Sequence, residues 1–232
     1  MTHIPVVSIQ RLDLAFAPRR WSFADERRAE IDAHFAMLRR GKPDLWNGRV
    51  LMLGEHALAN GVLSGQFFET DFASLIAWKD WGTPDRSVTN CFAQGALQAA
   101  DGAFLLGVMA PHTVNAGQIY FPSGTPEPGD VVGDAVDLAG SVLREVAEET
   151  GLGPDDFSAV PGWHVVLAGP RMALMQILRA PLDAEPLRRR ILDHLASEQK
   201  PELADIRIVR GPADLDPKMQ DFVLAFLGHW WR

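Results

Sequence analysis

The sequence has 232 residues, which is long enough to bury a substantial core in one large domain or in a core domain with a smaller one attached. Its formal net charge of −8 argues against a protein that coats nucleic acid, because such proteins neutralise phosphates with Lys and Arg. A small phosphorylated substrate remains compatible with this charge, since a bound metal reverses the local field. The single cysteine, Cys91, excludes an intrachain disulfide. Residues 1–21 lack the basic start and apolar core of a secretion signal, and no stretch reaches transmembrane length, so we expect a cytoplasmic protein with no membrane partner.

The first 88 residues are predicted to form a folded α+β extension packed on the domain that follows. Residues 6–16 alternate apolar and polar side chains in their second half, which favours a strand. One helix is expected to begin at Ser22 or Asp25 and another at Thr70 or Asp71, because these residue types cap helices. The expected elements are strands at 6–16, 50–53 and 57–68, with turns at Gly54 and Asn60-Gly61, and helices that end near Arg40 and Trp81.

Residues 89–232 are predicted to form the main domain. Asp101-Gly102 lies between two apolar runs and favours a tight hairpin turn. Gly169-Pro170 similarly separates two runs that read as strands. The expected elements are strands at 93–99, 104–109, 118–121, 163–168, 172–180 and 205–210, and helices at 185–197 and 218–231.

Three carboxylates share one face of a further predicted helix. Glu145, Glu148 and Glu149 stand at positions i, i+3 and i+4, where like charges repel. They also lie in the last turn if Gly151 ends the helix, and the helix dipole is negative there. A bound Mg²⁺ or Mn²⁺, which prefers oxygen ligands, would offset both penalties; the alternative is a solvated acidic surface. Beside them is an apolar stripe expected to dock the helix on a core, formed by Ala139, Val142, Leu143 and Val146.

The 144–152 segment, Arg-Glu-Val-Ala-Glu-Glu-Thr-Gly-Leu, resembles the second half of the Nudix hydrolase signature. That signature is Gly-x5-Glu-x7-Arg-Glu-U-x-Glu-Glu-x-Gly-U, with U a bulky aliphatic residue. The first half is matched by Gly124 through Asp130, with Asp in place of Glu. Thirteen residues rather than seven separate Asp130 from Arg144, so residues 131–138 are interpreted as a loop extension beside the active site.

This resemblance implies an α/β fold, a Nudix-type α/β/α sandwich with a mixed sheet, and cleavage of a nucleoside diphosphate linked to another group. It implies that Glu145, Glu148 and Glu149 bind Mg²⁺ or Mn²⁺ and that Arg144 orients a carboxylate. Gly124 would contribute its backbone carbonyl or its loop conformation. The family's general base varies in position, and three carboxylates remain open for that role: Glu198, Glu202 and Glu127.

Residues 45–48 and 70–78 are similar to segments of the Nudix enzymes that hydrolyse UDP-sugars, which makes a UDP-sugar the first substrate class and ADP-ribose, NADH-like or CoA-like compounds the next. Trp46, Trp78 and Trp81 could stack on a base or sugar, or could simply pack. Arg86 and Arg171 are candidate phosphate ligands. The partner would be a small nucleoside diphosphate derivative bound by a monomer or homodimer. The alternatives are a Nudix-fold sensor that binds such a ligand without turnover, and an interaction domain with an acidic helix.

Overall fold

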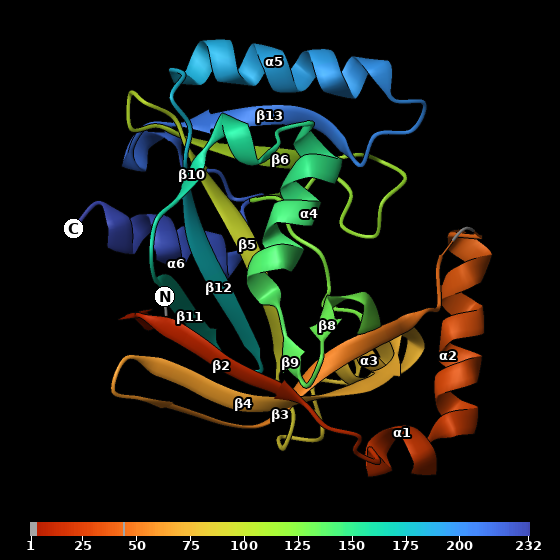
Figure 1. Ribbon diagram of the computed structural model, residues 1–232. Helices are drawn as coiled ribbons and strands as arrows, with labels where there is room; N and C mark the ends of the chain where they lie inside the picture. The colour runs from red at the N-terminus through yellow and green to blue at the C-terminus, as the bar shows by residue number, and fades with distance from the viewer. Residues whose placement is uncertain (1–3, 44) are drawn as a thin grey trace.

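The larger of two mixed β-sheets forms the centre of the protein. The computed structural model describes residues 4–43 and 45–232 (Figure 1). The first three residues of the segment 1–21, which was considered above as a possible secretion signal, lie outside the described residues. The main strand order is β1-β11-β12-β5-β6-β13, with β10 beside β12 and β7 beside β6; the β12–β5 pair is parallel and the other pairs are antiparallel. These strands are β1 (Val6–Ile9), β5 (Asn90–Gln98), β6 (Phe104–Met109), β7 (Ile119–Tyr120), β10 (Ser158–Ala159), β11 (Trp163–Ala168), β12 (Arg171–Arg179) and β13 (Leu203–Val209).

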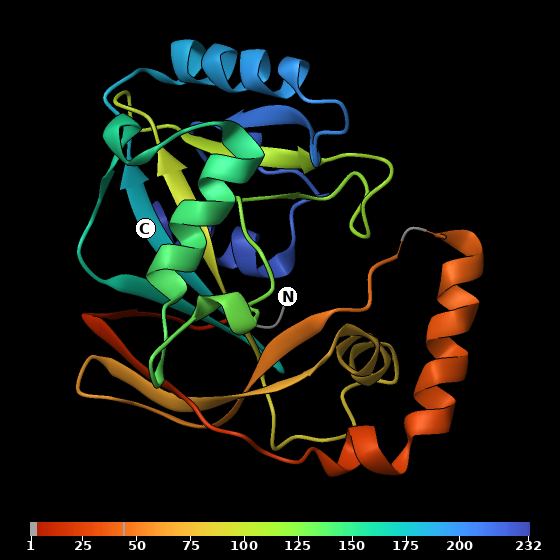
Figure 2. The ribbon, with the colours of Figure 1, turned by 45° about the vertical axis from the view of Figure 1, so that its right-hand side comes forward.

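Helices cover both faces of this sheet (Figures 1 and 2). On β5, Gly95 faces α4 (Leu138–Thr150), and a Cβ at this position would lie only 2.6 Å from Val146 Cγ2, so glycine permits the close approach of the helix. Phe92 faces the opposite side and packs edge-to-face on Phe222 of α6 (Asp221–Trp230). A third helix, α5 (Ala184–Ser197), packs on β13. The predicted mixed α/β architecture is therefore confirmed.

The second sheet has the order β3-β4-β2-β9-β8, in which only β2 and β4 are parallel. Three helices gather beside it around a separate core that contains Trp21, Phe35, Phe68 and Trp78. This arrangement gives the N-terminal part its own apolar centre. Its elements are β2 (Arg11–Phe16), α1 (Ser22–Glu26), α2 (Arg28–Gly41), β3 (Arg49–Ala59), β4 (Val62–Asp71), α3 (Phe72–Asp80), β8 (Val131–Val132) and β9 (Ala135–Val136).

The predicted single strand at 6–16 is wrong, because the chain changes sheets at Gln10. Val6 and Val7 of β1 pair with β11 of the large sheet, whereas Leu12 of β2 pairs with Leu63 of β4. The backbone N–H of Gln10 donates to the carbonyl of Gly61 at 2.8 Å, which anchors the chain at the change. One continuous stretch therefore serves both sheets.

Two other predicted boundaries are also corrected. The helix expected from residue 22 to 40 is two helices, because Arg27 leaves helical geometry at φ −108° and ψ 21°. Gly54 does not end a strand; β3 runs through it with a register shift between Leu53 and His56. The predicted turns at Asn60-Gly61 and Asp101-Gly102 and the bounds of β11 agree with the structure.

The two sheets exchange strands across the predicted domain boundary between residues 88 and 89. β1 from the N-terminal part extends the large sheet, and the 131–138 segment supplies the hairpin β8–β9 to the small sheet. The segment interpreted as a loop extension is therefore mostly a strand pair. Single 3₁₀ turns lie at Pro128–Asp130, Pro154–Asp156 and Pro212–Asp214. Among the described helices, none has the length and apolar character needed to cross a membrane.

Candidate functional site

The carboxylates of α4 are positioned by a helix with defined ends. Asp137 caps its start by accepting from the backbone N–H of Gly140 at 2.9 Å, and Gly151 ends it in the left-handed region at φ 70°, as predicted. Val142 and Val146 are fully buried, which holds this face on the sheet. The acidic side chains consequently lie along the border of the core and do not all point to solvent.

Arg144 joins the two halves of the acidic motif. Its Nη2 donates to Asp130 Oδ1 at 2.8 Å and its Nη1 donates to Glu145 Oε1 at 2.7 Å. The thirteen-residue spacer does not separate these groups, because the β8–β9 hairpin returns the chain and Asp137 N donates to Asp130 O at 2.8 Å. Asp130 is buried beneath the guanidinium, and its Oδ2 also accepts from Glu127 N at 3.0 Å. Arg144 thus orients two carboxylates at once.

Burial opposes the ionisation of Glu149 and Glu145, and only Glu145 of the two is paired with Arg144. Glu149 is 5% exposed; its Oε1 accepts a long hydrogen bond from Ser123 N at 3.4 Å, and its buried Oε2 has no partner. Burial first, and then the charges of Glu145 and Glu202, raise the pKa of Glu149 well above its ordinary value. Burial also raises the pKa of Glu145 to about 7 despite the opposing effect of Arg144. An additional positive charge would stabilise both ionised groups.

Gly124 lies directly against Glu145. A Cβ at this position would collide with the Glu145 carboxylate, so any other residue would push the loop or the side chain away. This geometry agrees with a role for the conformation of Gly124, while its carbonyl makes no contact that the structure records. The Ser123-Gly124 loop and α4 therefore form one surface.

The residues present fit a hard divalent cation. Among the described residues, no group of three or more His, Cys, Asp or Glu side chains is already arranged as a metal site, and Arg144 lies on Glu145 and 3.7 Å from Glu148. The fit rests on the unpartnered buried oxygen of Glu149 and on the all-oxygen donor set of the three glutamates. The Glu148 side chain is 62% exposed. The donor chemistry is that of Mg²⁺ or Mn²⁺.

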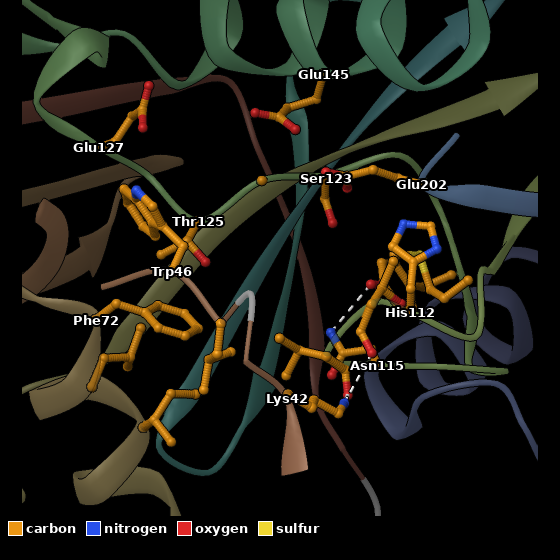
Figure 3. Close-up of a pocket in the computed structure, with 18 of the residues that line it drawn as sticks. Lys42, Trp46, Phe72, His112, Asn115, Ser123, Thr125, Glu127, Glu145 and Glu202 are labelled. Carbon is orange, nitrogen blue, oxygen red and sulfur yellow. Dashed lines mark hydrogen bonds between the residues drawn. The ribbon is translucent and has the colours of Figure 1, made fainter. Parts of the chain in front are cut away.

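A pocket of about 880 Å³, here called the main pocket, opens in front of this surface. Glu145, Ser123 and Gly124 line its core-domain wall, and Trp46 and Phe72 line the opposite wall, which the N-terminal part supplies (Figure 3). Its volume lies in the range of small-molecule sites. The N-terminal part is therefore half of the candidate site.

The three candidate bases fall in different places. Glu202 and Glu127 both line the main pocket with Glu145 (Figure 3). Glu198 does not; it ends α5, where its carboxylate lies 3.6 Å from His194 Nε2. The charge of Glu202 raises the pKa of both Glu145 and Glu149, so among the three candidates Glu202 both lines the main pocket and acts on the acidic pair.

All three predicted substrate contacts, Trp78, Arg86 and Arg171, lie outside the main pocket. Trp78 is 1% exposed in the second core, where its Nε1 donates to the carbonyl of Asp85 at 2.9 Å, so the packing alternative applies to it. Arg86 is exposed on the connection after α3 and lines neither pocket. Arg171 lines a smaller adjoining recess, with its charge paired to Asp221 at 2.7 Å. Trp46 differs from these residues, because it is 54% exposed on the pocket wall.

Sequence reasoning missed several polar residues at the main pocket. Lys42 Nζ donates to the carbonyls of Thr113 and Val114 at 2.9 and 3.0 Å, which joins the end of α2 to the loop after β6. Lys79 and Asn115 also line the pocket. No periodic or motif signal marks them, because loops distant in sequence bring them together. By contrast, the similar segments 45–48 and 70–78 do meet, since Asn47 Oδ1 accepts from Ala73 N at 2.8 Å.

Comparison with known proteins finds similarity in structure only. The sequence matches no protein-family model and no curated protein. RenU, a Nudix hydrolase from M. smegmatis, is 15% identical with a TM-score of 0.40, and the match covers 61% of this chain and 81% of that one. The Bacillus subtilis pyrophosphohydrolase BsRppH is 15% identical, with a TM-score of 0.35 and coverage of 58% and 72%. Tm1382, whose assignment as a Nudix hydrolase is provisional, is 11% identical, with a TM-score of 0.44 and coverage of 79% and 98%.

Proposed function

We propose that this chain is a divalent-metal-dependent pyrophosphohydrolase of the Nudix type, which cleaves the diphosphate of a nucleoside diphosphate linked to another group. The observation that carries the proposal is Glu149, a buried carboxylate with an unpartnered oxygen, which lies one helical turn from Glu145, and Glu145 lines a ligand-sized pocket. A structural carboxylate would be hydrogen-bonded, because an unpartnered buried charge is costly. The acidic signature on α4 supplies the matching chemistry.

Each part of the site has a distinct task in this proposal. Glu145, Glu148 and Glu149 would hold Mg²⁺ or Mn²⁺, which when bound neutralises diphosphate charge and lowers the pKa of water. Arg144 holds Asp130 and Glu145 in place. A carboxylate on the pocket wall, Glu202 before Glu127, accepts the proton of the attacking water. Lys42 and Lys79 line the same pocket and offset phosphate charge.

A UDP-sugar is the first substrate class in this proposal. The two segments similar to the UDP-sugar-hydrolysing enzymes contribute to one wall of the main pocket, where Asn47 Oδ1 accepts from Ala73 N in the first turn of α3 and Trp46 leaves its ring exposed. An exposed aromatic face can stack on a base. ADP-ribose, NADH-like and CoA-like compounds are the next classes.

Product analysis tests the reaction class. Protein is incubated with Mg²⁺ or Mn²⁺ and a panel of UDP-sugars, ADP-ribose, NADH, CoA and nucleoside triphosphates, beside Glu149→Gln and the matched control Glu198→Gln. We expect UMP and a sugar phosphate from wild type and Glu198→Gln, and no product from Glu149→Gln. Equal turnover by Glu149→Gln would refute the metal site. A compound that raises the melting temperature of wild type without being cleaved would instead favour a ligand-binding protein.

A further inference from the structure

A second pocket of about 170 Å³ adjoins the main pocket. The two share Ser123, Gly124 and Thr125, the loop that lies against Glu145, so the smaller pocket begins where the diphosphate would lie. We call it the carboxamide recess after the four carboxamide side chains in its lining, Asn90, Gln94, Asn115 and Gln220. Asn90 and Asn115 line the main pocket as well.

Gln94 presents an unsatisfied acceptor to this recess. It is fully buried, and its Nε2 donates to Ser123 Oγ at 3.0 Å and to the carbonyl of Phe121 at 3.3 Å, while its Oε1 has no partner. A buried amide oxygen left in this state costs about 1–3 kcal/mol. The recess has room for roughly five or six waters, so one bridging water would not fill it. A ligand that brings a hydrogen-bond donor to Gln94 would remove this cost.

Two cations, Arg171 and Lys79, line the recess, and the one that lines the recess alone is already paired. Arg171 is the recess's own cation, and its guanidinium is paired with Asp221 at 2.7 Å and lies 5.5 Å from the centre of the Phe222 ring. Phe222 and Phe92 form an edge-to-face pair at 5.2 Å that gives the recess an apolar wall. Lys79 lines both pockets, at their junction, where the phosphates would lie. Carboxamides both donate and accept, which suits hydroxyl groups, and the aromatic wall suits the C–H face of a ring.

We propose that the carboxamide recess binds the neutral polyhydroxyl group attached to the diphosphate, with Gln94 Oε1 accepting a hydrogen bond from one of its hydroxyls. This inference rests on the proposed function and assigns the orientation of the substrate in the two pockets. The nucleoside lies toward Trp46 in the main pocket, and the sugar lies in the recess. It predicts discrimination among nucleoside diphosphates according to the sugar that they carry.

The test compares the affinities of UDP-glucose and UDP, measured by calorimetry in Ca²⁺ with product analysis to establish that the ligand stays intact. Wild type is expected to bind UDP-glucose at least tenfold more tightly than UDP, because only the former reaches the recess. Gln94→Leu and Gln220→Leu should reduce this ratio to about threefold or less, with UDP affinity within twofold of wild type, because Gln94 and Gln220 line the recess and not the main pocket. Asn90 lines both pockets, so Asn90→Ala should reduce the ratio and also lower UDP affinity. If Gln94→Leu does not fold, Asn90→Ala and Gln220→Leu carry the test.

Gln176 provides a matched control. Its Oε1 is also buried without a partner, but it lies on β12 and lines neither pocket, so Gln176→Leu should leave the ratio unchanged. Equal wild-type affinity for the two ligands would overturn the proposal. An equal loss of both ligands in Gln94→Leu and in Asn90→Ala would also overturn it, because it would show that these side chains only order the Ser123 loop.

Failure of the proposed function is separable from failure of the recess. If no uridine nucleotide is bound or cleaved, the proposed function fails, and the recess is then tested with methyl α-glucoside by saturation-transfer NMR. A signal in wild type that disappears in Asn90→Ala would sustain a polyhydroxyl site. No signal, or an equal signal in Asn90→Ala, would overturn it.

Discussion

Helices α3 and α4, which contribute to opposite walls of the main pocket, each carry a carboxylate that is shielded from solvent, and the two carboxylates differ in how well the protein compensates their charge. At the start of α3, Asp71 accepts from Ser74 N at 2.9 Å and from Arg28 Nη1 at 2.7 Å. Burial acts to raise the pKa of Asp71, but these hydrogen bonds outweigh it and hold the pKa below its usual value. On α4, Glu149 has one long hydrogen bond and an unpartnered oxygen, and burial raises its pKa.

This difference separates a structural acid from a candidate functional one. Both carboxylate oxygens of Asp71 accept hydrogen bonds from the protein, so Asp71 needs no ligand to compensate its charge. Glu149 is stabilised only if something from outside the chain brings positive charge to it. In the proposed function, the N-terminal wall is a scaffold that presents aromatic rings, and the α4 wall carries the groups that act on the diphosphate. The predictions that follow each test one side of this contrast.

The largest effect is expected for Glu149→Gln, which keeps the size of the side chain and removes its charge. Loss of about 4 kcal/mol of transition-state stabilisation would lower kcat/KM roughly a thousandfold. Because the folded protein raises the pKa of Glu149, ionising it costs stability at neutral pH, so the variant should melt at a higher temperature than wild type in EDTA. Added Mg²⁺ should stabilise wild type more than the variant. Identical melting curves in all four conditions would contradict a metal site at Glu149.

Glu202→Gln and Glu198→Gln test the assignment of the base. Glu202 lines the main pocket and Glu198 does not, so the first substitution should lower kcat about a hundredfold and the second should leave it within twofold. Steady-state kinetics at saturating Mg²⁺ measure both. If Glu202→Gln retains wild-type kcat, Glu127→Gln should show the loss. Retention of kcat in both pocket variants would exclude a side-chain carboxylate base on this wall.

Asp71→Ala should lower the stability of the protein and leave kcat nearly unchanged. It removes the cap of α3 and leaves Arg28 with less compensation, so the free energy of unfolding should fall by about 2 kcal/mol. Because the pKa of Asp71 is lowered in the folded state, its contribution is present above the unfolded value near about 4 and is lost on acidification. The variant should therefore lose less stability than wild type between pH 5 and 2, measured by urea unfolding. A large fall in kcat per folded molecule would contradict the scaffold role.

Local patterns predicted the parts of the fold that depend on neighbours in sequence. The spacing of Glu145 and Glu149 and the stop at Gly151 depend on helical periodicity alone, and both predictions match the geometry of α4. The division of residues 6–16 between two sheets could not be predicted in this way, because it is decided by pairing with β11 and β4, which are distant in the chain.

The same limit applies to the candidate site. Glu198 and Glu202 lie four positions apart and look alike in sequence, yet of the two only Glu202 lines the main pocket. Glu202 directly precedes β13, and its carbonyl accepts from Ala110 N at 2.8 Å, just after β6. The carboxamides of the recess come from β5, the loop after β6 and the start of α6. Their proximity is a product of tertiary structure. Each of these side chains alone is an ordinary polar residue in an ordinary element.

Substitutions of Trp46 and Trp78 are expected to have the smallest effects, and they separate ligand binding from packing in the N-terminal part. Trp46 is 54% exposed on the main pocket, so Trp46→Ala should raise KM for a UDP-sugar about five- to tenfold and change the free energy of unfolding little. Trp78 is buried and donates to the carbonyl of Asp85, so Trp78→Phe should cost about 1 kcal/mol of stability through the lost hydrogen bond and leave KM near its wild-type value.

Initial-rate kinetics and urea unfolding on the same preparations separate the two effects. Trp46 lies about 6.0 Å from Phe72, centre to centre, and the rings are tilted by 50°, so they do not form a closed stacked pair and a face of Trp46 remains free for a ligand ring. If Trp46→Ala changes stability and not KM, that face only packs. The aromatic rings of the scaffold wall would then serve folding alone, and nucleoside recognition would have to come from the α4 wall and the loop after β6.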